Sequence, residues 1–453
     1  MASVSTSRSS SPAAVVTRAS SKDVITTSFV PARVSSLRSA IFWMLSGRVI
    51  YNLSQFGVLA ALVNICSTSA AGHFVLGLAV TAPVVMFCNL QLRLVLATDV
   101  RHEVPFADYL AVRNLMAVVA LGLILALSMC AESRQVAVII GAVGVSKLIE
   151  SISDIHYGRL QRANRTNVVS RSLFIRGLTS FALATMACLA FESVMGVGIA
   201  LSLGGLAVLL LHDVPASTGL NHERQYESCR DRPADRRERV LKLVWRGLPL
   251  AVGSALMSLE ANAPRYVVAA HFDANLLAVV GVMTYALAAG QTLVTALCYP
   301  AVPRLAAHYA EGRTRAFLRL LGKLFVLGGF AALVAFAAAT LFGRQLLLVV
   351  MGEDFAAHST LFVLTVAAGG IQVIQHILLN ALRAMRHFRI VSLVQLAGLI
   401  TTAALCVALT HLAGVNGVGW ALILSFSSGT LLCSALIYLS MRGRSEHAGR
   451  NPY

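Results

Sequence analysis

Charged side chains recur at helical spacing within a long apolar segment near residues 135 to 157. Lys147, Glu150 and Asp154 lie three and four residues apart, so they share one face of a helix, together with Tyr157. This face therefore carries one cation and two carboxylates. Close carboxylates in a low-dielectric environment tend to hold a proton, which makes Glu150 and Asp154 candidates for binding a proton or another cation.

A second apolar segment, near residues 245 to 270, contains Glu260, Asn262, Pro264 and Arg265. A charge at the centre of a bilayer costs about 2.5 to 3.5 kcal/mol, so these groups are expected to face other protein or a watery cavity. Pro264 removes a backbone donor and tends to kink a helix. Glu260 and Arg265 lie about 140° apart around an ideal helix, so their partners are expected on other helices.

Three further apolar segments carry milder polar faces. Their polar residues are Arg48, Tyr51, Asn52 and Gln55 near 41 to 64, Gln291 near 276 to 298, and Gln372, His376, Asn380 and Arg383 near 359 to 382. Such side chains can bind a polar ligand in a shared cavity. The alternative for each polar face is internal pairing, which holds the helices of membrane proteins together.

The composition indicates an integral membrane protein. The chain has 453 residues, of which 57% are hydrophobic and 13% charged, and its mean hydropathy is +0.74, which is too apolar for a soluble domain of this size. Apolar runs of about 18 to 25 residues, long enough to span a bilayer as a helix, occur twelve times. They lie near residues 41–64, 74–96, 112–130, 135–157, 171–191, 194–212, 245–270, 276–298, 318–341, 359–382, 390–411 and 417–440.

The positions of the basic residues explain the net charge of +17 by membrane topology. If the N-terminus is cytoplasmic, 32 of the 37 Lys and Arg residues fall in tails and connections on the cytoplasmic side, and only Arg134 and Arg344 fall on the other side. Cytoplasmic loops of membrane proteins carry this excess. Both termini are therefore expected in the cytoplasm, and the charge does not indicate nucleic-acid binding.

The eight cysteines are scattered, nearly all within or beside the apolar runs, and no CxxC pair occurs. They are expected to act as small apolar residues rather than as metal ligands or disulfide partners. No metal site and no cofactor is expected.

The pattern divides the chain into five parts. We expect a disordered cytoplasmic tail over 1–37, a six-helix lobe over 38–213, a cytoplasmic linker over 214–243, a second six-helix lobe over 244–441, and a cytoplasmic tail over 442–453. An organelle transit peptide is the alternative for the first tail. The two lobes share an internal similarity, because LQRANRTNVVS at 160–170 aligns without gaps to LRAMRHFRIVS at 382–392. Two like-oriented halves are typical of transporters, whose binding site lies at their interface.

Four stretches resemble the Wzx-type oligosaccharide flippases of the polysaccharide transporter family. They are KLIESISDIHYGRLQ, SRSLFIRG, EANAPRYVVA and YPAVPRLAAHYAEG. The resemblance covers about residues 38 to 441, and these flippases are similar in fold to the MATE exporters of the same multidrug, oligosaccharidyl-lipid and polysaccharide exporter superfamily. It implies an all-α polytopic protein with two pseudo-symmetric six-helix lobes in the bacterial cytoplasmic (inner) membrane.

The resemblance also implies a function and roles for individual residues. The protein would flip polyprenyl-diphosphate-linked oligosaccharide repeat units by alternating access, for surface polysaccharides such as O-antigen, lipopolysaccharide or exopolysaccharide. Cationic lumen residues would bind the diphosphate and sugar acids, a role carried onto Arg48, Lys147 and Arg265. The residues expected to bond sugar hydroxyls are Gln55, Asn262, Gln291 and Gln372. The candidates for binding a coupling proton or cation are Glu150, Asp154 and Glu260.

Other interpretations remain open. A MATE-like cation-coupled exporter of small molecules would be favoured by a lumen dominated by acids, and Glu260 could simply neutralise a cation on another helix. An enzyme is not expected, because the outer connections are short and carry no cluster of His, Asp or Glu. The implied partners are the lipid-linked oligosaccharide, membrane lipids, and a polysaccharide polymerase with other assembly proteins.

Overall fold

The computed structural model describes residues 37–99, 104–220 and 233–450, and residues Ser36–Tyr453 form one compact unit. The described residues contain helices and turns but no strand, and twelve helices are long and apolar enough to cross a membrane. The chain is thus a multi-pass membrane protein, and the expected all-α class is confirmed. Of the tail predicted over 1–37, residues 1–36 lie outside the described residues, and Leu37 begins the first helix.

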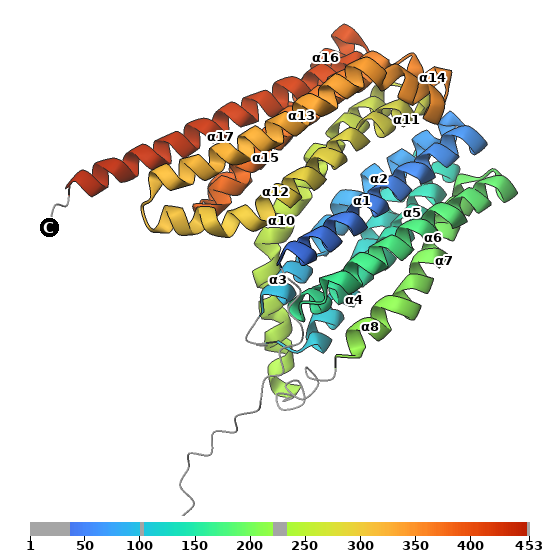
Figure 1. Cartoon of the computed structure of the whole chain (residues 1–453). Coiled ribbons are helices and arrows are strands. Elements are labelled where there is room, and N and C mark those ends of the chain that lie inside the picture. The colour runs from blue at the N-terminus through green and yellow to red at the C-terminus, as the bar shows by residue number, and fades with distance from the viewer. Residues whose placement is uncertain (1–36, 100–103, 221–232, 451–453) are drawn as a thin grey trace, which may run out of the picture. The chain divides into compact units, whose positions relative to one another are not determined.

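The first lobe contains the helices before residue 220. They are α1 (Leu37–Ala61) with the π-helical turn η1 (Leu62–Cys66), α2 (Thr68–Cys88), α3 (Leu92–Thr98), α4 (Phe106–Ser128), α5 (Arg134–Arg162), α6 (Thr166–Phe191), α7 (Val194–Val208), the π-helical turn η2 (Leu209–Asp213) and α8 (Val214–Thr218). Within this lobe α1 packs on α6, and α5 packs on α2, α4 and α7 (Figure 1).

The second lobe contains the remaining helices. They are α10 (Pro233–His271), α11 (Ala274–Met283), α12 (Tyr285–Ala310), α13 (Thr314–Met351), α14 (Glu353–Ala356), α15 (Ser359–Ala384), α16 (Phe388–Ala413) and α17 (Asn416–Arg450). Here α15 packs on α12, α13 and α17, and α16 packs on α10 and α17.

Several helices are longer or more divided than the apolar runs suggest. The expected linker over 214–243 contains α8 and the beginning of α10, and its residues 221–232 lie outside the described part. The span expected at 276–298 consists of α11 and α12, which meet at Thr284. The Thr284 hydroxyl donates to the carbonyls of Val280 and Gly281, a type of bonding that bends helices. Helix α17 continues through most of the expected C-terminal tail.

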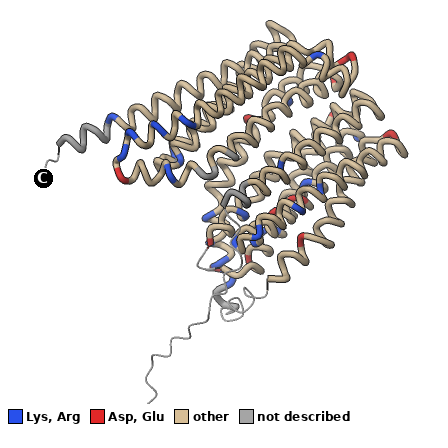
Figure 2. Tube along the Cα trace, in the orientation of Figure 1, with Lys and Arg blue, Asp and Glu red and all other residues tan. Residues whose placement is uncertain are grey.

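Basic residues gather at one end of the helices, here termed the basic end. Figure 2 shows Lys and Arg concentrated there, with few at the opposite, outer end. The α5–α6 and α15–α16 connections lie at this end and coincide with the internal similarity. Asn164 and Arg386 occupy equivalent positions in the two turns, with left-handed φ angles of 56° and 64°. In each turn the next residue donates its amide to the carbonyl five residues earlier, at 2.8 Å and 3.1 Å, which is a Schellman ending.

An apolar cluster shared by both lobes closes the outer end. It includes Leu59 and Phe74 of the first lobe and Leu277, Val280 and Leu347 of the second. Burial of such side chains excludes water from this end.

Close backbone contacts reinforce this closure. A methyl group on Gly72 of α2 would lie 1.9 Å from the Ala274 carbonyl oxygen, so only glycine permits this approach. Asn64 Nδ2 donates to the Val350 carbonyl at 2.9 Å. The lobes therefore touch at the outer end through backbone as well as side chains.

Helix α10 contacts both lobes. Near its beginning, Arg236 Nε and Arg239 Nε donate to the two carboxylate oxygens of Asp108 at 3.1 Å and 2.8 Å. Asp108 lies in the first turn of α4 and is buried. A methyl group on Gly247 would lie 2.6 Å from the Leu90 carbonyl oxygen, in the turn between α2 and α3. The first part of α10 is thus fixed to the first lobe, whereas its later part packs on α16 and also contacts α2, where Tyr266 Oη donates to the Ala79 carbonyl.

The two ion pairs of Asp108 predict that substituting Asp108 destabilises the protein more than substituting Arg236. Asp108→Asn leaves two guanidinium groups without an anionic partner and is expected to lower the free energy of unfolding by about 2 to 4 kcal/mol. Arg236 is 57% exposed, so Arg236→Ala should cost less than about 1 kcal/mol. Thermal unfolding of the detergent-purified protein would measure both variants. Equal shifts would show that the buried carboxylate does not anchor α10.

Candidate functional site

A polar chamber of about 280 Å³ lies between α1, α3, α6 and α12. Its polar lining residues are Arg48, Asn52, Arg93, Gln291, Thr292 and Thr295. It borders the first half of α1 and the short helix α3, so it lies nearer the basic end than the closed outer end. Asn52 Nδ2 donates to Thr292 Oγ1 at 3.0 Å, which links the two lobes at the chamber wall.

The two arginines of the polar chamber differ in their partners. Arg48 is exposed to the chamber and makes no hydrogen bond or ion pair with any residue in the described part of the chain. Arg93 donates to Asp154 Oδ1 at 2.7 Å and to Gln161 Oε1 at 3.0 Å. Arg48 therefore offers donors that no described residue uses, while Arg93 is held in place by its ion pair with Asp154.

Lys147 and Glu150 lie around a second, much smaller cavity within the first lobe. Lys147 Nζ and Tyr51 Oη donate to the two oxygens of Glu150 at 2.9 Å and 2.8 Å. The cavity also borders Gln55 and Arg176. Its volume of about 20 Å³ holds about one water molecule. The structure thus places Lys147 and Gln55 on this small cavity and not on the polar chamber.

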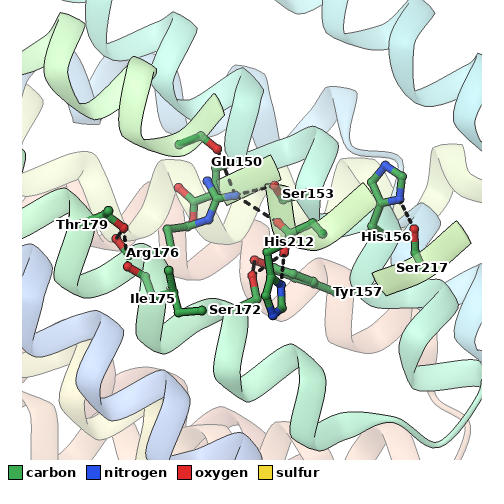
Figure 3. A network of polar contacts seen from close by, with 12 residues as sticks. Glu150, Ser153, His156, Tyr157, Ser172, Ile175, Arg176, Thr179, His212 and Ser217 are labelled. Atoms are coloured by element: carbon green, nitrogen blue, oxygen red, sulfur yellow. Dashed lines mark hydrogen bonds and ion pairs between the residues drawn. The ribbon is translucent and has the colours of Figure 1, made fainter. Parts of the chain in front are cut away.

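A buried network extends from this cavity toward the basic end. Arg176 Nη2 donates to Asp213 Oδ2 at 3.2 Å and to Ser153 Oγ at 2.5 Å (Figure 3). Ser172 Oγ donates to Asp213 Oδ1 at 2.5 Å and contacts Tyr157 Oη at 2.7 Å. Asp213 is fully buried, so its charge is matched by Arg176 and by hydroxyl donors rather than by water.

Asp154 and Glu150 do not form a carboxylate pair. Asp154 is held by Arg93, and Arg113 Nη2 lies 3.8 Å from its second oxygen. Glu150 has its own cation, Lys147. Each carboxylate of this helical face is therefore neutralised by its own cation. The geometry does not favour a proton shared between Glu150 and Asp154.

In the second lobe, Arg265 has neutral partners. Its Nη1 donates to Asn262 Oδ1 and its Nη2 to Thr284 Oγ1, both at 2.9 Å, and its Nε is buried without a partner among the described residues. Asn262 is buried and also donates to the Ser258 carbonyl. Arg265 thus carries its charge to the junction of α11 and α12 with no carboxylate beside it in the described chain.

Glu260 lies apart from Arg265, as the helical spacing predicts. Its carboxylate is half-buried against α16, where a methyl group on Gly398 would lie 2.6 Å from Glu260 Oε1. It makes no hydrogen bond or ion pair with any residue that the structure describes. No cation on another helix neutralises it within those residues.

The polar face of α15 joins the polar chamber through Gln291. His376 Nδ1 lies 2.5 Å from Gln291 Oε1. Gln372 lies one turn away, and its Oε1 is buried with no partner in the described residues. Gln291 therefore lines the polar chamber, whereas Gln372 does not.

Sequence reasoning missed the residues whose partners are far away in the chain. Arg93 pairs with Asp154, and Arg176 pairs with Asp213, in each case between distant segments. Among the described residues, no group of three or more His, Cys, Asp and Glu side chains could hold a metal ion.

No family model matches the chain. The capsular polysaccharide biosynthesis protein CapF of Staphylococcus aureus is 20% identical over 324 residues, which cover 71% of this chain and 79% of that protein.

Solved structures show which fold this is. The inward-facing conformation of a multidrug resistance MATE family transporter matches with a TM-score of 0.70 at 15% identity, covering 90% of this chain and 96% of that one. An outward-facing MATE transporter matches with a TM-score of 0.62 at 15% identity, covering 90% and 97%. The Vibrio cholerae MATE transporter VcmN, in its bent form, matches with 0.60 at 13% identity, covering 90% and 98%. The chain has the fold of MATE transporters, which occurs in both inward- and outward-facing conformations.

Variants of the Lys147–Glu150 ion pair can distinguish a structural role of this pair from a role in transport. Glu150→Gln or Lys147→Met alone leaves one charge without its partner, and each should lower the thermal unfolding midpoint clearly, at a cost of about 2 to 4 kcal/mol. The double variant removes both charges and is expected to recover much of that loss. If the pair serves transport, the folded double variant should be inactive in reconstituted vesicles. Full activity would mean that the pair only holds helices together.

Proposed function

We propose that this protein is a flippase that moves polyprenyl-diphosphate-linked oligosaccharides across the bacterial cytoplasmic membrane for surface polysaccharide synthesis. The observation that carries the proposal is the polar chamber, which is lined by amide and hydroxyl groups and by the guanidinium of Arg48, to which no described residue is bonded. The similarity to CapF, named for capsular polysaccharide biosynthesis, supports the same substrate class. The MATE transporter fold supports a transport role rather than an enzymatic one.

The chamber chemistry suits a diphosphate-bearing head group. A guanidinium forms strong charge-assisted hydrogen bonds to phosphate oxygens, and no residue in the described ranges occupies the donors of Arg48. Gln291 and Thr295 offer groups that can bond sugar hydroxyls. Because a charged head cannot cross hydrocarbon unaided, it needs such donors along its path. Rocking of the two lobes would then expose the chamber to each side in turn.

The basic end is proposed to face the cytoplasm, with both termini on that side. The excess of Lys and Arg at this end supports the orientation. The outer end is closed by the shared apolar cluster, and the TM-score is higher for the inward-facing relative than for the outward-facing one. This conformation is therefore the one proposed to receive substrate from the cytoplasmic leaflet and, with it, from the enzymes that build the glycan.

Coupling to a proton or cation is assigned to Glu260 or to Glu150. Glu260 has no counter-charge among the described residues and is half-buried, which favours exchange of a proton or cation at its carboxylate. Glu150 adjoins a cavity large enough for one water molecule, but Lys147 already neutralises it. Asp154 is likewise neutralised, by Arg93 and Arg113, so Glu260 is the stronger candidate.

A second candidate function is cation-coupled export of small molecules. The observation that favours it is the fold, which is shared with multidrug MATE transporters. In that case Glu260 would bind the exchanged cation, and the apolar walls of the chamber would contact the exported compound. Arg48 has no evident role in binding a cationic drug.

Substitution of Arg48 tests the flippase proposal. In a host that lacks the gene, Arg48→Ala should reduce surface polysaccharide about 10-fold or more, because loss of a charge-assisted bond worth about 1.5 to 3 kcal/mol corresponds to that change. Lipid-linked intermediates should accumulate on the cytoplasmic side. Arg265→Ala is expected to reduce export as well. Arg344→Ala, which removes an exposed outer ion pair with Glu353, is the matched control and should export normally.

Normal surface polysaccharide in the gene deletion, with changed sensitivity to a cationic compound, would overturn the flippase proposal in favour of the exporter. Protein levels in the membrane must match among variants, so each is quantified by immunoblot.

A further inference from the structure

An apolar groove lies between α12, α13 and α15 in the second lobe. Its volume is about 440 Å³, and all 17 residues that line it are apolar, seven of them alanine and four glycine. On α13 the lining residues run from Ala331 to Leu346 along one helical face. The groove occupies the half of these helices nearer the outer end.

Between Ala331 and Gly343 of α13, every alanine and glycine except Ala337 lines the groove. The opposite face carries large apolar side chains, among them Phe330 and Leu333, which are 68% and 64% exposed. These are suited to contact with lipid. Side-chain size on α13 therefore differs between its two faces, although both are apolar.

In membrane proteins, small residues normally allow two helices to approach closely. This happens between α13 and α15, where a methyl group on Gly370 would lie 3.0 Å from Ala332 Cβ. Helices α12 and α13 do not approach closely at the groove, because Ala289, Ala335 and Ala338 remain exposed. The alanines there leave space rather than close it, and in a bilayer such space is filled by hydrocarbon.

The groove and the polar chamber both adjoin a third cavity. An intermediate apolar cavity of about 580 Å³ lies between α1, α12 and α13. It shares Asn52 and Thr292 with the polar chamber and shares Ala289 and Leu346 with the groove. Three neighbouring cavities thus extend from the guanidinium of Arg48 to the groove.

We infer that the groove holds the hydrocarbon chain of the transported lipid while its diphosphate head occupies the polar chamber. The inference rests on the flippase function proposed above. One molecule with an anionic head and a long apolar chain matches both ends of this series of cavities. A chain attached to a head near the basic end must run toward the middle of the bilayer and the outer end, which is the direction of the groove.

The hydrophobic effect does not drive this contact, because the chain leaves one apolar environment for another. Binding instead depends on van der Waals contacts along the alanine face. The groove therefore selects chains long enough to reach it from the chamber. It also holds the chain while the head remains in the chamber.

The test is binding of diphosphate lipids that differ only in chain length. Geranyl, farnesyl and undecaprenyl diphosphate would be titrated by mole fraction into nanodiscs that contain the full-length protein. For the wild type, affinity should rise at least about 5-fold from geranyl to undecaprenyl, roughly 1 kcal/mol. Ala335→Trp fills the groove and should remove this rise while leaving geranyl diphosphate binding unchanged. Leu333→Trp, on the lipid-facing side of α13, should behave as the wild type.

The outcomes separate this inference from the proposed function. If every diphosphate lipid binds but chain length has no effect, or if Ala335→Trp keeps the full chain-length dependence, the groove assignment is wrong and the flippase proposal stands. If the wild type binds no diphosphate lipid at all, both fail. Ala338→Trp provides a second groove variant in case the first is not expressed.

Discussion

A charge inside a membrane-spanning helix must be matched by another charge or by hydrogen bonds, and this requirement organises the first lobe. Lys147 with Glu150 and Arg176 with Asp213 satisfy it within and across helices that the hydrophobic effect alone would not hold in register. The lobe therefore gains specific partners for α5 and α6. Arg48 and Glu260, which have no partner in the described chain, then become distinctive, because nothing in the described fold accounts for their charges.

The two ends of the protein are built from different interactions. At the outer end, apolar side chains and close glycine contacts join the lobes. Toward the basic end, the contact between lobes is polar and borders a cavity, as at Asn52 and Thr292. A polar contact can exchange its hydrogen bonds with water, whereas the apolar contact excludes water. The conformation thus combines a closed outer end with a polar cavity nearer the basic end.

Most of the fold could be predicted from the sequence because span length and charge asymmetry are local properties. The twelve apolar runs correspond to helices, and the aligned turns at Asn164 and Arg386 share one geometry. The candidate site was harder to predict from the sequence. Helical spacing placed Lys147 and Glu150 on one face correctly, but it could not show that Arg93 reaches Asp154 or that a cavity beside Glu150 holds only one water molecule. Those facts depend on contacts between distant segments.

The contacts of helix α10 affect how the two lobes can move relative to each other. Its first turns are tied to Asp108 and Leu90 of the first lobe, and Tyr266 near its end still donates to a backbone carbonyl of α2 in that lobe. The later part of α10 also packs on α16 of the second lobe. Helix α10 therefore belongs to both lobes, and a change in the angle between them must bend it or separate it from one of its neighbours. Pro249 and Pro264 lack amide donors, so bending stiffness is lowest near these two residues.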